Sequence, residues 1–139
     1  MSTITFHQED ISFRLKKIKK IKSWITQSIA LEKNVLGDLN YIFCSDTYLH
    51  KINLEYLKHD TLTDIITFDY SEKKQNSGDI FISIDRIKEN AIKFKQSIEN
   101  ELNRVLIHGV LHLLGYKDKT PKDKELMRAK EDFYLTLLS

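Results

Sequence analysis

The chain has 139 residues, of which 41 % are hydrophobic and 30 % are charged, and its formal net charge is +2. This composition is typical of one globular domain over residues 1–139 and excludes collagen-like, disordered and membrane-spanning chains. The first residues lack the pattern of a secretory signal, and the single cysteine, Cys44, cannot form an internal disulfide, so a cytoplasmic protein is expected.

The first half of the chain predicts a strand, a helix, a second strand and a short helix. Residues 2–7 alternate weakly and are expected to form a strand. Residues 13–31 are expected to form an amphipathic helix, because apolar residues recur there at helical spacing: Leu15, Ile18, Ile21, Ile25 and Ile29. Gly37 breaks the pattern before a strand over residues 39–44. Ser45 or Asp46 then caps a short helix that runs through Tyr56.

Basic residues are concentrated in the first expected helix. Six of them and no acidic residue lie between positions 11 and 31: Arg14, Lys16, Lys17, Lys19, Lys20 and Lys22. The remainder of the chain is acidic on balance, so a polyanion can be attracted to one face of an almost neutral molecule. A solvated helix face explains the same lysines equally simply, and both interpretations stay open.

The second half predicts two more strands and three helices. Strands are expected over residues 64–70 and 78–84, with the polar residues 71–77 as a loop between them. Asp85 is expected to cap a helix that buries Ile87, Ala91 and Phe94. After a break near Ser97, residues 101–114 are apolar nearly all round and predict a central, covered helix. Thr120-Pro121 starts a last helix with a core stripe of Leu126, Phe133 and Leu137. This element order predicts an α+β domain with a mixed sheet of about four strands.

The candidate chemistry lies at the end of the central helix. His108 and His112 are four residues apart, so their imidazoles converge on one helix face, a spacing that suits zinc. Gly115 can end the helix in the left-handed conformation and return the chain, which brings Asp118 to the same point. Three ligands leave the fourth position of zinc open, as in catalytic sites, where the pKa of bound water falls to near 7.

Other interpretations of these residues stay open. The two histidines can be packing residues, Asp118 can be a loop carboxylate or a cap, and Cys44 is a core residue rather than a ligand. His7, His50 and His59 show no partner spacing. Zinc peptidases of the H-E-x-x-H type place glutamate directly after the first histidine, whereas Gly109 stands here, which argues against peptide hydrolysis and favours phosphodiester chemistry.

Residues 108–118, HGVLHLLGYKD, resemble the signature H-G-x-L-H-L-x-G-Y-D-H of the YbeY family of bacterial metal-dependent endoribonucleases. Asn53 to Tyr56, residues 63–68 (TDIITF) and residues 78–80 (GDI) are similar to further blocks of that family. The resemblance implies a zincin-like metal-binding helix, one Zn²⁺ per chain held by His108, His112 and Asp118, a cytoplasmic location, and ribosomal RNA and the ribosome or its small subunit as partners. It also implies single-strand-specific cleavage in 16S rRNA 3′ end maturation and ribosome quality control.

Two positions depart from the family pattern. Asp118 stands where the family's third ligand is usually histidine, so a divalent cation there would leave the site formally less positive. Leu57 stands where the family has an arginine, and Lys58 beside it is not given that arginine's role.

The sequence therefore predicts a metal-dependent endoribonuclease in which Lys16, Lys17, Lys19 and Lys20 guide RNA. Two alternatives remain. One is a zinc-dependent hydrolase of peptides or small molecules. The other is a ribosome-assembly factor in which the metal only fastens the helix end.

Overall fold

The computed structural model of the chain describes residues 2–57 and 63–138. Over these residues the elements are β1 (Thr3–Gln8), α1 (Ile18–Leu31), β2 (Val35–Cys44), α2 (Asp46–Ile52), a π-helical turn (Asn53–Leu57), β3 (Ile65–Asp69), β4 (Gln75–Ser83), α3 (Ile84–Lys93), α4 (Ile98–Leu113) and α5 (Pro121–Thr136). Their order confirms the predicted α+β domain. Within the described ranges, no helix is long and apolar enough to cross a bilayer.

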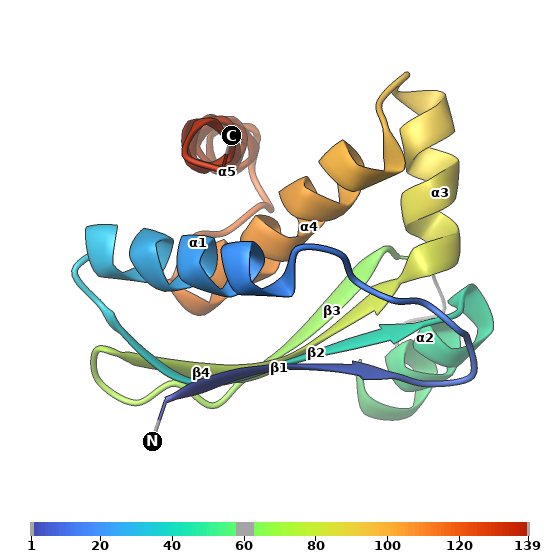
Figure 1. Cartoon of the computed structure of the whole chain (residues 1–139), viewed down its shortest axis with the longest axis horizontal. Helices are drawn as coiled ribbons and strands as arrows, with labels where there is room; N and C mark the ends of the chain where they lie inside the picture. Colours follow the sequence, from blue (N-terminus) through green and yellow to red (C-terminus); the bar gives the residue numbers. More distant parts are fainter. Residues whose placement is uncertain (1, 58–62, 139) are drawn as a thin grey trace.

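The strands form one mixed sheet in the order β1-β2-β4-β3. β1 pairs in parallel with β2, and β2 pairs in parallel with β4, whereas β3 runs antiparallel to β4. Helices α1 and α4 cover one face of this sheet, with α5 packed beyond them (Figure 1). Side chains alternate between the two faces along a strand, so Ile80 and Ile82 meet the α1–α4 layer. Phe81 lies on the opposite face with Leu49 of α2.

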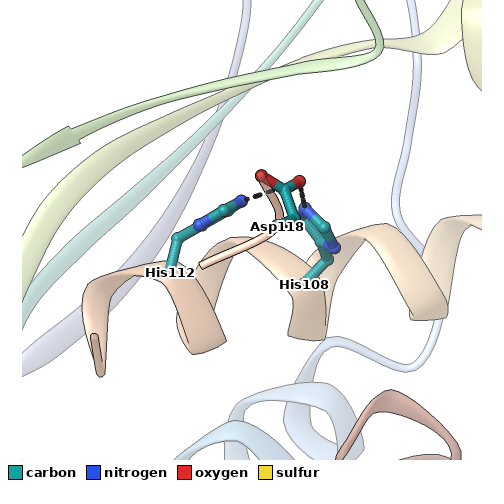
Figure 2. A group of neighbouring side chains, drawn as sticks. All are labelled: His108, His112 and Asp118. Atoms are coloured by element: carbon teal, nitrogen blue, oxygen red, sulfur yellow. Dashed lines mark ion pairs between the residues drawn. The ribbon is translucent and has the colours of Figure 1, made fainter. Parts of the chain in front are cut away.

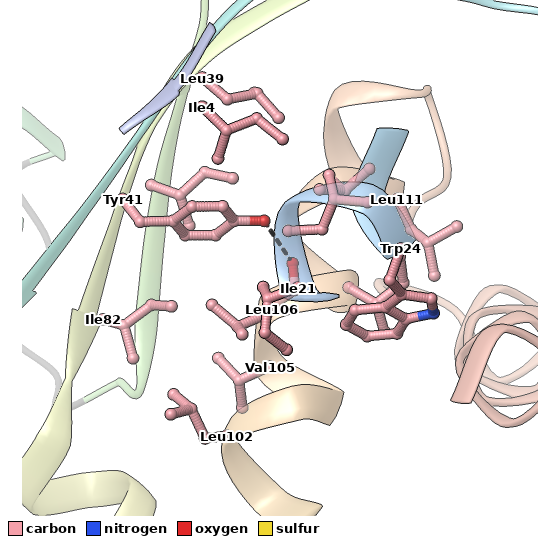
Figure 3. Close-up of a cluster of buried hydrophobic side chains, with 14 of the residues drawn as sticks. Ile4, Ile21, Trp24, Leu39, Tyr41, Ile82, Leu102, Val105, Leu106 and Leu111 are labelled. Carbon is pink, nitrogen blue, oxygen red and sulfur yellow. Dashed lines mark hydrogen bonds between the residues drawn. The ribbon is translucent and has the colours of Figure 1, made fainter. Parts of the chain in front are cut away.

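The main core lies between the sheet and the two covering helices (Figure 3). Ile25, Tyr41 and Leu106 are completely buried there. The hydroxyl of Tyr41 donates to the backbone oxygen of Leu106 at 2.9 Å, which satisfies a polar group inside an apolar layer. Because this bond joins the central strand β2 to the middle of α4, it fixes the height of α4 above the sheet.

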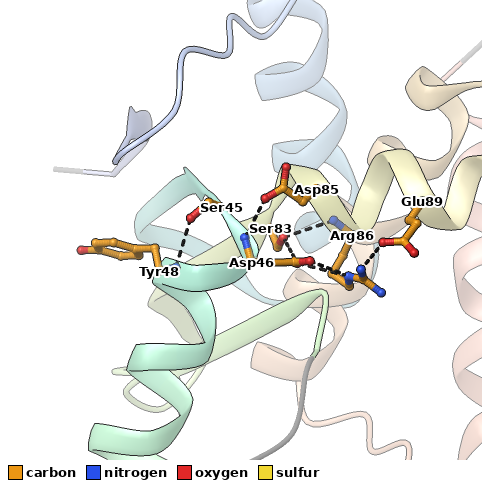
Figure 4. Close-up of polar contacts among 7 residues, drawn as sticks. All are labelled: Ser45, Asp46, Tyr48, Ser83, Asp85, Arg86 and Glu89. Carbon is orange, nitrogen blue, oxygen red and sulfur yellow. Dashed lines mark hydrogen bonds and ion pairs between the residues drawn. The ribbon is translucent and has the colours of Figure 1, made fainter.

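A polar cluster joins the starts of α2 and α3 (Figure 4). Ser45 caps α2, as predicted, by accepting from the backbone N–H of Tyr48. The prediction that Asp85 caps α3 is wrong: Ser83 is the cap, and Asp85 accepts from the backbone N–H of Asp46 at 2.9 Å. Asp46 in turn accepts from the Arg86 side chain at 2.9 Å. The tertiary approach of α2 gives Asp85 a partner outside its own helix.

Several predicted boundaries in the first part of the chain need correction. Helix α1 begins at Ile18 and not at residue 13, because Lys17 adopts a left-handed conformation with φ 57°. Phe13 instead packs edge-on against Phe43, and so the segment before α1 buries its apolar side chains without being helical. Gly37 does not precede β2 but lies within it, at an irregularity in the pairing with β4.

Three further expectations in the second half are wrong. Residues 71–77 are not an open loop, because β4 already begins at Gln75 after a tight turn at Lys73. Phe94 is 55 % exposed, since α3 ends one residue before it. The predicted core stripe of α5 is exposed, and the buried residues lie one position along: Met127, Glu131 and Tyr134. The indole N–H of Trp24 donates to the backbone oxygen of Tyr134 at 2.7 Å, which sets this rotation of α5.

Candidate metal centre

Helix α4 carries both histidines of the predicted site. It begins after Ser97, whose side chain accepts from the backbone N–H of Asn100 at 3.0 Å, so the break predicted near Ser97 is confirmed as a helix cap. One turn of helix separates His108 from His112, and their ring centroids lie 4.5 Å apart. Both side chains are about one fifth exposed, at 19 % and 24 %. The pair therefore faces a cleft and not the closed core.

The turn after α4 brings the third side chain back to the histidines. Gly115 has φ +105°, a conformation that favours glycine, as the sequence predicted. The backbone N–H of Tyr116 bonds the oxygen of Leu111 at 3.0 Å, and the side chain of Asn76 donates to the oxygen of Leu113 at 2.9 Å. These bonds satisfy carbonyls that the end of a helix leaves free. The sheet thus holds the helix end from which the chain returns to Asp118.

Asp118 lies between the two imidazoles (Figure 2). Its Oδ2 is 3.4 Å from Nε2 of His108 and 3.5 Å from Nε2 of His112. One ligand atom from each of the three residues lies within 4.8 Å of the others, and no other such group is found in the part of the chain that the structure describes. Two nitrogen donors and one carboxylate oxygen at this spacing can hold a metal ion.

The outer ring nitrogens support the same interpretation. Nδ1 of His108 lies 2.6 Å from Oε2 of Glu131, and Nδ1 of His112 lies 3.1 Å from the backbone oxygen of Tyr116. Both partners are acceptors, so each Nδ1 carries the proton and each Nε2 presents its lone pair towards Asp118. Metal-binding histidines are oriented in this way by carboxylates and carbonyls. The donor set therefore fits a divalent cation such as zinc.

Glu131 is the center of a buried charge network behind His108. It is 5 % exposed, and its other oxygen accepts from Nη1 of Arg104 at 2.8 Å. Arg104 also donates to Asp132 at 2.8 Å. Burial opposes the protonation of His108, but the hydrogen bond to Glu131 outweighs it and raises the pKa of His108. Burial and the neighbouring His108 lower the pKa of His112, which favours the neutral imidazole that metals bind.

The three candidate ligands line a cleft of about 540 Å³ between β3, α3, α4 and α5. Asp64, at the start of β3, also lines it, and burial raises the pKa of this carboxyl group. Arg104 and Arg128 bring positive charge to the walls. Arg128 is exposed and makes no hydrogen bond or ion pair with the residues that the structure describes. Its guanidinium is therefore available to an anion in the cleft.

Position 109 does not face this cleft. A Cβ atom added to Gly109 would lie 2.9 Å from Cγ2 of Ile80 and 3.0 Å from Cδ1 of Ile65, because α4 packs closely on the sheet here. Glycine thus allows the histidine helix to approach β3 and β4. A peptidase-type glutamate at this position would point into the sheet and away from the histidines.

The basic residues predicted to bind RNA separate into two groups. Lys16, Lys17 and Lys20 line a second cleft, of about 640 Å³, whereas Lys19 does not. Lys16 and Lys17 precede α1 and are not part of the predicted helix. Lys17 forms an exposed ion pair with Glu99 at 3.4 Å.

The remaining residues singled out in the sequence lie away from the metal centre. Cys44 is buried in the core, as predicted, and burial raises its pKa to about 12. His7 is exposed on β1, and His50 lies on α2. Leu57 is 40 % exposed and is not among the described residues that line the metal cleft. Lys58 and His59 lie outside the described residues.

Sequence reasoning missed Glu131, Arg104, Arg128 and Asp64 as neighbours of the metal centre. Arg104 carried a usable signal, because it lies one turn before His108 on the same face of α4. Asp64 belongs to the TDIITF block noted above, although nothing in its spacing placed it near the histidines. Glu131 and Arg128 had no local signal, since only the docking of α5 brings them there.

Comparison with known proteins assigns a family to this arrangement. The family model described as endoribonuclease YbeY matches residues 3–139. A protein named endoribonuclease YbeY from Cytophaga hutchinsonii is 54 % identical over 136 residues, covering 97 % of this chain and 95 % of the relative. One of the same name from Flavobacterium johnsoniae is 54 % identical over 129 residues, covering 93 % and 92 %. A solution structure of a Thermotoga maritima protein matches with a TM-score of 0.68 at 27 % identity, covering 98 % of this chain and 89 % of the other.

Proposed function

Because the chain belongs to the endoribonuclease YbeY family, we propose that it acts as one such domain that cleaves single-stranded RNA in the cytoplasm, in maturation of the 3′ end of 16S rRNA and in ribosome quality control. The family establishes a nuclease that hydrolyses phosphodiester bonds of RNA. The observation that supports a cleavage site in this chain is the convergence of His108, His112 and Asp118 in a cleft with positively charged walls.

The proposed cofactor is one Zn²⁺ per chain, held by Nε2 of His108, Nε2 of His112 and a carboxylate oxygen of Asp118. When bound, zinc supplies Lewis-acid polarisation of a phosphoryl oxygen and lowers the pKa of water. Nitrogen donors from two imidazoles favour zinc over magnesium or calcium, which prefer oxygen ligands. The Asp118 carboxylate makes the site formally less positive than three neutral imidazoles would.

The cleft walls supply the remaining electrostatic requirement. A phosphodiester is negatively charged and gains negative charge on its oxygens during cleavage, so a nearby cation stabilises it. Arg104 is already bound by Glu131 and Asp132. We therefore assign contact with the substrate phosphate to the free guanidinium of Arg128. Exposed lysines before and in α1, namely Lys16, Lys17, Lys19 and Lys20, guide the polyanion towards the cleft.

Peptide hydrolysis is disfavoured by the surroundings of Gly109. The tight packing of this position against Ile80 and Ile65 leaves no route for a glutamate base to reach the cleft. A ribosome-assembly factor that uses the metal only to fasten the helix end differs from a nuclease in one measurable respect, which is that it binds RNA without cutting it.

The deciding experiment compares the unmodified chain with Asp118→Ala on a single-stranded RNA that carries the unprocessed 3′ end of 16S rRNA. The side chain of Asp118 is 43 % exposed, so the substitution should leave the fold intact. We expect about one zinc per chain and chelator-sensitive cleavage in the unmodified protein, and loss of both in the variant. Bound zinc without RNA cleavage would overturn the nuclease proposal in favour of the assembly factor.

A further inference from the structure

We propose that the second cleft, the one lined by Lys16, Lys17 and Lys20, is a binding subsite for the RNA strand that extends from the metal centre. This inference rests on the proposed function and adds to it a place where several nucleotides beyond the cleaved bond are held. The cleft lies where the segment before α1 meets the first turns of α4 and the end of α5, and its volume is about 640 Å³.

Charge on the rim of this cleft matches a polyanion. Arg14, Lys16 and Lys20 are exposed and make no ion pair with the residues that the structure describes. Lys17 is paired only with Glu99, in a solvent-exposed contact that a phosphate can replace at little cost. Unpaired cations on flexible stems at the edge of a hollow are suited to successive phosphates of a strand.

The floor of the cleft suits nucleobases. Leu15 and Leu102 are buried beneath it, and Phe13, half-buried against Phe43, forms part of its wall. Proteins that bind single-stranded nucleic acid combine a basic groove with apolar or aromatic surfaces that the bases cover. Double-stranded RNA keeps its bases stacked inside the helix, so an apolar floor below a basic rim favours a single strand.

The two clefts meet on α4. Glu101 and Arg104 line both of them, so one turn of the helix separates the basic cleft from the metal centre. Burial and the nearby carboxyl of Asp64 raise the pKa of Glu101, which weakens the negative charge at this junction. A strand whose phosphate lies at the histidines can therefore continue over the Arg104 turn into the basic cleft.

The test uses a matched pair of double variants. Lys16→Gln/Lys20→Gln removes two cations from the cleft, and Lys19→Gln/Lys22→Gln removes two exposed cations of α1 that line neither cleft. Binding of labelled 2′-O-methyl oligonucleotides of about 4 and about 12 nucleotides to the zinc-loaded protein is measured by fluorescence anisotropy across a salt series. Intact label after each titration shows that binding alone is observed.

We expect the longer oligonucleotide to bind at least tenfold more tightly than the shorter one to the unmodified protein and to the control variant. In Lys16→Gln/Lys20→Gln this length-dependent gain should fall to about twofold, and the salt slope should decrease by about 1.4, or about 0.7 for each phosphate contact. Equal losses in both variants would overturn the subsite, because general attraction would explain them. No length-dependent gain in the unmodified protein would also overturn it, including when the cleavage assay shows nuclease activity. RNA binding with the expected gain but without cleavage would support the subsite and reject the nuclease proposal alone.

Discussion

The carboxylate of Glu131 offers the sharpest test of how the metal centre is organised. Its two oxygens accept from Nδ1 of His108 at 2.6 Å and from Nη1 of Arg104 at 2.8 Å, and its side chain is only 6 % exposed. Glu131→Gln keeps the volume but removes the negative charge, and the amide has one acceptor oxygen in place of two. The variant therefore cannot hold both donors.

Two effects of Glu131→Gln can be estimated. Loss of a carboxylate that orients a metal-binding histidine typically weakens metal affinity roughly 10- to 100-fold, which corresponds to about 1.4–2.7 kcal/mol. Arg104 keeps Asp132 as a partner, so its guanidinium is not left wholly unpaired. The loss of a buried charged hydrogen bond should lower the free energy of unfolding of the metal-free protein by about 2 kcal/mol.

The assay is competition for zinc against a chelator of known affinity, with denaturant unfolding of the metal-free protein measured in parallel. Asp132→Asn is the matched control, because Asp132 bonds the same arginine, is 58 % exposed and makes no contact with His108 in the described structure. We expect its zinc affinity to stay within about twofold of the unmodified protein. A zinc affinity of Glu131→Gln that also stayed within twofold would refute the role of Glu131 in orienting His108.

Two other predictions follow from charges near the site. Arg128→Ala should lower the rate of RNA cleavage by roughly 100-fold with unchanged zinc content, whereas Lys124→Ala, an exposed change on α5 outside both clefts, should not, and equal rates for both variants would exclude phosphate contact by Arg128. Glu32 accepts from Tyr116, Tyr134 and Lys130, and these bonds outweigh its burial and lower its pKa from 4.5. Glu32→Gln should therefore cost about 2 kcal/mol of unfolding free energy near pH 7, and the difference should shrink as the pH falls below about 4.5, since a depressed carboxyl pKa stabilises only the ionised form; a difference independent of pH between 7 and 3 would contradict this assignment.

The sequence by itself determined those features that depend on neighbours along the chain. The four-residue spacing of His108 and His112 on an apolar helix, Gly115 at its end and the cap at Ser97 are local properties, and each is confirmed. The strand pattern of Ile80 and Ile82 likewise follows from alternation alone. Local periodicity therefore predicted the fold class and the convergence of the candidate ligands.

Tertiary structure decided which side chains surround those ligands. The rotation of α5 is set by its docking against Trp24 and Arg104, so it buries Glu131 in place of the predicted apolar stripe. The same docking places Arg128 beside the cleft. Periodicity gives the faces of a helix but not which face meets the core when several are mixed, because that choice depends on partners more than 20 residues away, such as Arg104.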